Sequence, residues 1–404
     1  MPGLFDDLLV IDCASFIAAP AAATVLSDFG ARVIKVEPPG GEGYRMFSRL
    51  PGMPPSEHNY PWDAINRNKE SLCLNLKEQQ GQAILRRLIA RADIFITNYP
   101  LPVRHRLQLD YASLSALNPR LIYASFTPYG ESGPDAELTG YDATAWWARS
   151  GLMDAVRANQ ETEPAISVPG MGDYPSGLAL YSGIVSALYR RQKEGVGGEV
   201  SSSLLGNGLW SNSVRAQARL NGADMSVSLS RGQRSIFTEI YQTADNTWLL
   251  LTILPQVQAK IWPKLAACLG HPEWVDDPRF KEPADRRRHN AELLSLIDSR
   301  IRTRSRSEWT AEFDRLGITY GLVSTPDDFL NDQQPRAAGM IVEYADIPEK
   351  ATIDSPVYVD NIDKRRPAHG AELGCNTVSI LSELGYSDDE SEQLITNGIA
   401  FGAT

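Results

Sequence analysis

Residues 8–37 read LLVIDCASFIAAPAAATVLSDFGARVIKVE, and this stretch decides the fold. Its first residues, 8–12, form a short apolar run that is typical of a buried strand. The alanine-rich segment 18–29 predicts a helix that Gly30 ends, because glycine adopts the backbone conformation found after helix C-termini. Residues 32–37 predict a second strand. A strand, a helix and a strand in this order imply parallel strands joined by a right-handed crossover.

The same alternation continues through the first half of the chain. Further strands are predicted at 72–76, 93–97, 120–126 and 199–204, and an amphipathic helix at 81–92. We therefore expect an α/β fold with a doubly wound sheet. Ligands of such sheets bind beyond the carboxyl ends of the strands. The turns that follow Asp12, Glu37 and Thr97 are accordingly the candidate binding loops.

A second unit is expected after residues 206–224, which are rich in Ser, Asn, Gly and Ala and predict a connecting helix. Beyond them, strands are predicted at 236–243 and 248–253, and helices at 257–269 and 290–302. The length of 404 residues agrees with two domains.

Composition excludes several classes of protein. A net charge of −11 argues against general nucleic-acid binding, which requires clustered Lys and Arg. The four cysteines and five histidines are scattered without metal-ligand spacing, so we expect no metal. Residues 1–7 have no basic leader pattern and no apolar run is long enough to span a bilayer, so we expect a cytoplasmic protein without membrane contact. The turn at 13–20 lacks G-x-G-x-x-G, so we expect no NAD.

One carboxylate stands out at a corner between a loop and a helix. Residues 169–177 read PGMGDYPSG, and the helical spacing of Leu180, Ile184 and Leu188 follows directly. Asp173 is a candidate helix N-cap, since Asp is favoured there. It is also a candidate nucleophile, which the positive helix N-terminus would keep ionised. The two roles do not exclude each other.

Several segments together resemble the class III CoA-transferases, the family that contains formyl-CoA transferase and carnitine CoA-transferase. They are residues 8–41, NRNKESLCLN at 66–75, NPRLIYASFTPYGESGP at 118–134, the Gly172–Asp173 stretch with its helix, and residues 383–390. The resemblance spans nearly the whole chain. It implies a large Rossmann-like domain at 1–205 completed by 330–404, a linker helix at 206–224, a small α+β domain at 225–329, and two chains interlocked as linked rings.

The resemblance also implies a reaction. Asp173 matches the aspartate that attacks an acyl-CoA thioester to give a mixed anhydride and then an aspartyl-CoA thioester, and a small carboxylic acid finally accepts CoA. CoA would thus enter as a substrate, with no metal. The residues that match CoA-binding positions of the family are Ile17, Ala18, Leu74, Asn75, Lys77, Asn98, Tyr99, Arg106, Tyr141 and Asp142.

Departures from the family pattern limit what carries over. Pro38 and Thr139 stand where some members have cations, and Pro102 replaces a usual glycine, so the nucleotide end of CoA could be held differently. The glycine-run loop of formyl-CoA transferase is missing, which argues against formyl-CoA and oxalate as substrates. Arg231 and Arg234 lie there instead and suit a carboxylate-bearing acid, which is a hypothesis.

Two alternatives stay open. An α-methylacyl-CoA racemase would need a histidine base where this chain has Tyr141, and residues 106–270 contain no histidine. A relative that binds CoA without catalysis is the second alternative.

Overall fold

The computed structural model describes residues 3–159, 161–225 and 231–402. By its contacts the chain divides into two compact units: Met1–Val156, Pro164–Leu220 and Gln334–Thr404 form the first, and Arg157–Glu163 with Asn221–Gln333 form the second. Residues 226–230, at the start of the small domain expected from the sequence, lie outside the described residues. The domain limits derived from the sequence stay a prediction.

A seven-stranded sheet forms the centre of the first unit, in the order β12-β3-β2-β1-β4-β5-β6. The strands are β1 (Leu9–Cys13), β2 (Arg32–Glu37), β3 (Glu70–Leu74), β4 (Ile94–Thr97), β5 (Ile122–Thr127), β6 (Gly198–Ser203) and β12 (Ala400–Phe401). All neighbours pair in parallel except β12, which is antiparallel to β3. The order 3-2-1-4-5-6 is that of Rossmann folds. The predicted α/β class with a large parallel sheet is confirmed.

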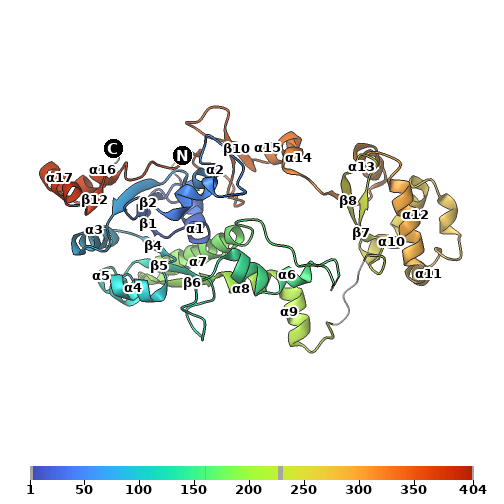
Figure 1. Ribbon diagram of the computed structural model, residues 1–404, viewed down its shortest axis with the longest axis horizontal. Helices are drawn as coiled ribbons and strands as arrows, with labels where there is room; N and C mark the ends of the chain where they lie inside the picture. Colours follow the sequence, from blue (N-terminus) through green and yellow to red (C-terminus); the bar gives the residue numbers. More distant parts are fainter. Residues whose placement is uncertain (1–2, 160, 226–230, 403–404) are drawn as a thin grey trace. The chain divides into compact units, whose positions relative to one another are not determined.

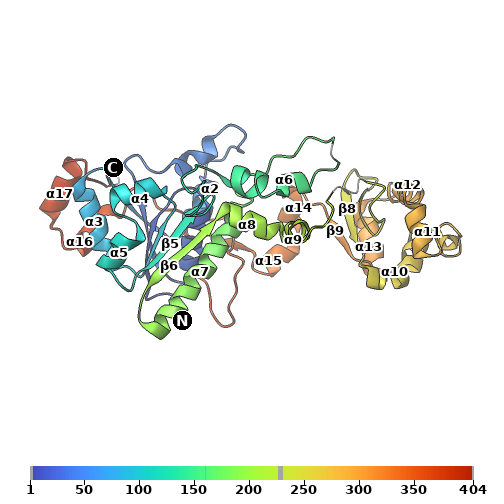
Figure 2. The same cartoon turned by 90° about the horizontal axis from the view of Figure 1, so that it is seen from below.

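Helices cover both faces of this sheet (Figure 1; Figure 2). One face packs on α1 (Ala18–Asp28) and α7 (Asp173–Glu194). The other packs on α3 (Gln79–Ile89), α4 (Leu101–Leu107), α5 (Tyr111–Leu117), α16 (Thr377–Glu383) and α17 (Asp388–Thr396). Because successive strand residues point to opposite faces, Val10 joins the first core and Ile11 the second. This double burial explains the apolar run IFIT of β4 and the apolar residues of β1, LVIDC, on both faces.

Small residues let α1 and α7 approach closely. A Cβ added at Gly177 would lie 2.6 Å from the carbonyl oxygen of Ala18 and 2.8 Å from the Cβ of Ala21, so only glycine fits there. The alanines of α1 serve the same close packing and are all buried. The contact brings Asp173, the first residue of α7, close to the N-terminus of α1.

The chain changes direction at β1 and β4, which pair with each other although β2 and β3 intervene in the sequence. The loops after the two strands are joined by one side chain. Asn98 Oδ1 accepts the Ser15 N–H (2.9 Å), and Asn98 Nδ2 donates to the Ser15 carbonyl (2.7 Å). Such a switch point is where ligands bind in open α/β sheets.

The C-terminal segment completes the sheet. Asn75 N–H donates to the Ile399 carbonyl, and β12 continues beside β3. In both views α16 and α17 lie beside α3 (Figure 1; Figure 2). The predicted strand at 72–76 is displaced by two residues, and the two-residue β12 is too short to leave a periodic pattern.

The second unit contains a smaller antiparallel sheet of β7 (Thr238–Gln242), β8 (Trp248–Thr252) and β9 (Tyr320–Leu322). Its helices are α10 (Pro255–Cys268), α11 (Pro283–Arg288), α12 (Asn290–Ile301), α13 (Arg306–Leu316) and α14 (Pro326–Asn331). One apolar cluster, with Trp262, Ile297 and Trp309 at its centre, holds sheet and helices together. The strands predicted at 236–243 and 248–253 are present as β7 and β8, and they pair antiparallel.

The remaining elements are short. They are the 3₁₀ helices Gly43–Arg49 and Pro272–Val275, the π-helix Asp142–Ala148, α2 (Tyr60–Asn66), α6 (Leu152–Ala155), α8 (Leu204–Ser211), α9 (Ser213–Leu220), α15 (Gln333–Ala337), β10 (Ile341–Glu343) and β11 (Ala351–Ile353). The stretch predicted as one connecting helix, 206–224, holds most of α8 and all of α9. Within the described ranges, no helix has the length and apolar character needed to cross a bilayer.

Candidate active site

A cleft of about 610 Å³ opens where β1 and β4 end, and all of its lining residues belong to the first unit. It brings together seven of the residues singled out in the sequence: Ile17, Ala18, Asn98, Tyr99, Tyr141, Asp142 and Asp173. These residues come from the loops after β1 and β4, the start of the π-helix and the start of α7. The cleft therefore gathers segments that are up to about 160 residues apart in the sequence.

Asp173 is the first residue of α7, but it does not cap the helix. Gly172 occupies the N-cap position, and no side chain makes a capping hydrogen bond. The N-cap interpretation of Asp173 is thus wrong. A side chain at the cap would collide with Trp146, whose ring atoms lie 2.5 Å from a Cβ built on Gly172. Because of Trp146, only glycine fits at the N-cap position, and Asp173 lies in the first turn of the helix instead.

The charge state expected for Asp173 is also corrected. Burial, together with the smaller effect of the nearby carboxylate of Asp142, raises the pKa of Asp173 to about 7. Burial and a like charge both disfavour the ionised form, and here they outweigh the attraction of the helix N-terminus. The Asp173 carboxyl group therefore titrates near pH 7 and is not fully ionised there.

Asp142 is tied to the turn that precedes Asp173. Its Oδ1 accepts the N–H of Ala143 (2.7 Å), and its Oδ2 lies 3.5 Å from the N–H of Gly172. Trp146 and Trp147, four and five residues later, are buried in the core. The start of the π-helix thus fixes one carboxylate beside the other.

Replacing Asp142 with Asn is expected to move the acid limb of the pH profile of kcat/KM, if Asp173 must be ionised to react. The limb should lie near pH 7 in the wild type and shift to lower pH in the variant, because loss of the Asp142 charge lowers the pKa of Asp173. Steady-state rates between pH 5 and 9 measure the shift. Glu137→Gln, which removes another cleft carboxylate, is the control and should leave the limb in place. An unmoved limb in Asp142→Asn would contradict the coupling.

Four of the residues singled out in the sequence do not line this cleft: Leu74, Asn75, Lys77 and Arg106. Leu74 is fully buried in the core at the end of β3. Asn75 is partly buried and its N–H is bonded to Ile399, while Lys77 and Arg106 are exposed. Their assignment to CoA stays a prediction.

Arg104, close to Arg106 on α4, is a residue that sequence reasoning missed. It is 1% exposed, its Nε donates to the Tyr99 carbonyl (2.6 Å), and its Nη1 pairs with Glu131 (2.5 Å). It therefore supports the loop after β4 from behind. Only the apolar face of α4, which includes Leu107, could have indicated that Arg104 points inward.

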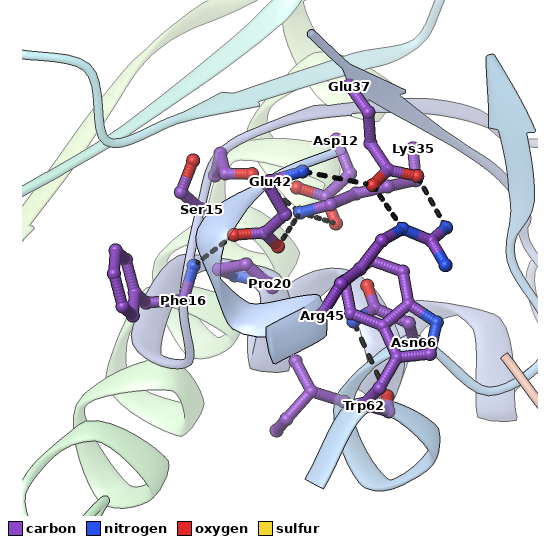
Figure 3. A network of polar contacts seen from close by, with 12 residues as sticks. Asp12, Ser15, Phe16, Pro20, Lys35, Glu37, Glu42, Arg45, Trp62 and Asn66 are labelled. Carbon is purple, nitrogen blue, oxygen red and sulfur yellow. Dashed lines mark hydrogen bonds and ion pairs between the residues drawn. The ribbon is translucent and has the colours of Figure 1, made fainter. Parts of the chain in front are cut away.

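Buried side chains make hydrogen bonds to the backbone of the loop after β1 and so hold it in place (Figure 3). Glu42 Oε2 accepts the N–H of Phe16 (2.9 Å), and Lys35 Nζ donates to the Ala14 carbonyl (2.5 Å). Phe16 has φ of +62°, a conformation that costs about 1–2 kcal/mol in residues other than glycine. The Glu42 contact helps to hold Phe16 in this strained state at the cleft wall.

A cluster of buried charges underlies this loop. Lys35 lies 3.0 Å from Glu42 and 3.7 Å from Asp12, and Lys69 lies 2.8 Å from Asp12. All four residues are 5% exposed or less. Burial lowers the pKa of Lys69 to about 8 against the attraction of Asp12. Neighbouring Glu37 is paired with Arg45 at 2.6 Å (Figure 3).

The arginines of the second unit that were considered for binding an acid already have partners. Arg231 pairs with Asp298 (2.8 Å) and Arg234 with Glu239 (2.9 Å). Across the described ranges, no three His, Cys, Asp or Glu side chains are grouped so as to hold a metal ion. The expected lack of metal and NAD stays a prediction.

Known proteins resemble this chain along its full length. The chain is 31% identical over 397 residues to cinnamoyl-CoA:phenyllactate CoA-transferase of Clostridium sporogenes, covering 97% of this chain and 96% of that protein. It is 28% identical to (R)-2-hydroxy-4-methylpentanoate CoA-transferase of Clostridioides difficile, covering 96% and 97%. The crystal structure of a CaiB/BaiF family protein from Brucella suis superposes with a TM-score of 0.83 at 28% identity, covering 95% and 100%. The profile of CoA-transferase family III matches residues 5–372, so the chain belongs to CoA-transferase family III.

Proposed function

We propose that this protein transfers CoA from an acyl-CoA thioester to a carboxylic acid, with Asp173 as the nucleophile. The observation that carries the proposal is the position of Asp173, on the wall of the cleft at the switch point of the sheet, with a pKa of about 7. Membership of the family and the names of the relatives support the same reaction class. A free carboxylate is the group that this chemistry needs, since an anhydride can form on it.

In the proposed reaction Asp173 forms three covalent intermediates in turn: a mixed anhydride, a CoA thioester and a second mixed anhydride. Its carboxylate oxygen attacks the thioester carbon, the C–S bond breaks, and a mixed anhydride with the donor acyl group forms while CoA thiolate leaves. The thiolate attacks the aspartyl carbonyl, which releases the donor acid and leaves an aspartyl-CoA thioester. The acceptor carboxylate attacks the aspartyl carbonyl of this thioester, the C–S bond breaks, and a second anhydride forms while CoA thiolate leaves again. Return of the thiolate to the acceptor carbonyl gives the new acyl-CoA and restores the Asp173 carboxylate, with no net proton change.

The raised pKa of Asp173 serves this cycle. A carboxylate that is partly desolvated and near a like charge is more nucleophilic than a solvated one, yet at pH 7 a large fraction is still ionised. Each acylation removes the negative charge from Asp173 and so relieves the repulsion with Asp142. The site thus favours the acylated states relative to the free carboxylate.

The alternatives need other groups. A racemase-like reaction calls for a base such as histidine, and none of the described residues that line the cleft is histidine. A purely CoA-binding relative would not need a reactive carboxylate. Retention of α-deuterium in the product acyl group is expected for transfer, whereas loss to solvent would favour the racemase.

Covalent trapping tests the proposal. The purified chain is incubated with an acyl-CoA in the absence of acceptor acid, digested, and analysed by mass spectrometry. We expect the peptide that contains Asp173 to gain the mass of CoA less one water, and hydroxylamine to remove the CoA group, whereas Asp173→Asn should show no adduct. Efficient transfer with no adduct, or with an adduct on another residue, would contradict the mechanism.

Assembly and location complete the proposal. We infer a homodimer of interlocked chains; the exposed side chains of Trp210, Val214 and Leu220 on α8 and α9 offer apolar surface for a partner. Sedimentation should give twice the chain mass of 44.5 kDa.

All four cysteines are free thiols, which supports a cytoplasmic location that fractionation of the host can test.

A further inference from the structure

A row of aromatic rings forms one wall of the cleft. The ring of Phe16 lies 6.2 Å from that of Tyr141 and 6.3 Å from that of Tyr44, which in turn lies 4.9 Å from Phe47. Phe16 and Tyr141 are 41% and 57% exposed, and both line the cleft together with Phe47. Their apolar surface therefore faces the cleft rather than the core.

This row reaches the reacting carboxylate. Phe16, Tyr141 and Asp173 line the same cleft. A Cβ built on Gly170, in the turn before Asp173, would lie 3.4 Å from the Cδ1 atom of Ile17, the neighbour of Phe16. A group attached to a carbonyl at Asp173 would thus have aromatic surface within reach.

The backbone of Phe16 adopts an energetically unfavourable conformation that places its ring at the cleft. Its φ of +62° is disfavoured for an aromatic residue, and the buried Glu42 stabilises it through the Phe16 N–H. Figure 3 shows the ring pointing away from the charged cluster that holds its backbone. Strain of this kind persists where the surrounding structure over-determines it, and here it keeps an apolar ring at the cleft instead of in the core.

The charged side chains that line the cleft are all acidic. Its charged lining residues are Glu137, Asp142 and Asp173, and none of the described residues that line it is Lys, Arg or His. A second carboxylate on the acyl group would lose water and meet only like charges. Arg231 and Arg234, which the sequence analysis considered for binding an acid, already pair with acidic side chains.

We propose that the cleft accepts acyl groups of monocarboxylic acids with an apolar aromatic or branched tail, and that Phe16 is a specificity-determining residue that contacts this tail. The inference rests on the proposed CoA transfer and adds the substrate class. Dicarboxylic acyl groups such as glutaryl or succinyl are poor substrates. Burial of a phenyl or isobutyl tail against the aromatic wall supplies the discrimination, of the order of 10–100-fold.

Isotope exchange between an acyl-CoA and its own labelled free acid tests this without knowledge of the natural partner. The full-length protein is assayed with 3-phenylpropanoyl-CoA, 4-methylpentanoyl-CoA, glutaryl-CoA, succinyl-CoA and propanoyl-CoA. We expect kcat/KM for the two apolar tails to exceed that for glutaryl and succinyl by about 10-fold or more. Equal or better exchange of the dicarboxylic groups would overturn the inference while leaving the proposed function intact. No exchange with any thioester would instead overturn the proposed function.

Variants of Phe16 test the residue. Glycine adopts a positive φ without strain, so Phe16→Gly removes the ring but keeps the loop. We expect about 10-fold lower kcat/KM for 3-phenylpropanoyl-CoA and less than about 3-fold change for propanoyl-CoA. Phe16→Asn, which also tolerates this backbone, is the second variant, and Tyr189→Ala, an exposed aromatic outside the cleft, is the matched control. Parallel loss for both thioesters would overturn the specificity role, and the wild-type panel decides the substrate class even if a variant fails to fold.

Discussion

Replacing Asp173 with Asn is expected to lower kcat for CoA transfer by about 10⁴-fold or more, because the amide cannot form the anhydride and no second nucleophile replaces it. CoA or acyl-CoA should still bind, since the loops after β1 and β4 that line the cleft do not depend on this side chain. Steady-state transfer and a binding titration, performed on the same preparation, separate the two effects.

The same substitution is expected to stabilise the fold at pH 8. The pKa of Asp173 is raised from 3.8 to about 7, so ionisation above pH 7 costs the folded state up to about 4 kcal/mol. The stability that the protonated carboxyl contributes is present below pH 4 and is lost as the pH rises through 7. Asn carries no charge, so the gain should appear at pH 8 and vanish below pH 4. Denaturant unfolding at the two pH values measures it.

Glu194→Gln serves as the control for both measurements, because Glu194 is exposed and pairs with the exposed Arg190 at the other end of α7. It should change neither rate nor stability by much. Transfer that survives in Asp173→Asn would contradict the assignment of the nucleophile. A destabilised Asp173→Asn at pH 8 would instead contradict the raised pKa.

Asp12→Asn is expected to cause the largest loss of stability. Asp12 is fully buried and lies 2.8 Å from Lys69 and 3.7 Å from Lys35, both of which are buried as well. Loss of its charge leaves two buried ammonium groups with too little compensation, which typically costs about 3–5 kcal/mol. Denaturant unfolding at pH 7 measures the change in the free energy of unfolding.

A double variant separates charge from packing. Asp12→Asn combined with Lys69→Met removes one of the uncompensated charges, so it should recover part of the loss. The exposed Arg190–Glu194 pair is the matched surface case, and Glu194→Gln should cost less than about 1 kcal/mol. A cost for Asp12→Asn as small as that of the surface variant would show that the buried cluster does not stabilise the fold.

The predictions for Asp173 and Asp12 concern neighbouring parts of the molecule. The buried cluster of Asp12, Lys35, Lys69 and Glu42 stabilises the carboxyl end of β1, and its members Lys35 and Glu42 hold the loop that lines the cleft. The strained Phe16 and the unfavourably ionised Asp173 both line the cleft that this loop borders. Functional sites commonly carry such local costs, which the surrounding fold compensates.

The sequence by itself determined the class of fold and the main candidate. Apolar runs at 8–12 and 32–37 with the helix between them predicted β1, α1 and β2 nearly to the residue, because local periodicity reports the burial of each element. The isolated carboxylate in PGMGDYPSG pointed to Asp173. The family resemblance placed CoA transfer on it, and membership of that family is confirmed.

Only the tertiary structure decided how the site is built. The contacts of Phe16 with Glu42, of Ser15 with Asn98 and of Asp12 with Lys69 join residues 26, 83 and 57 positions apart, and no local pattern encodes them. Asp173 changed from an expected helix cap to a first-turn residue because Trp146 leaves room only for Gly172. Its pKa rose instead of falling because burial and Asp142 act on it through space, and desolvation depends on the folded surroundings rather than on neighbours in the chain.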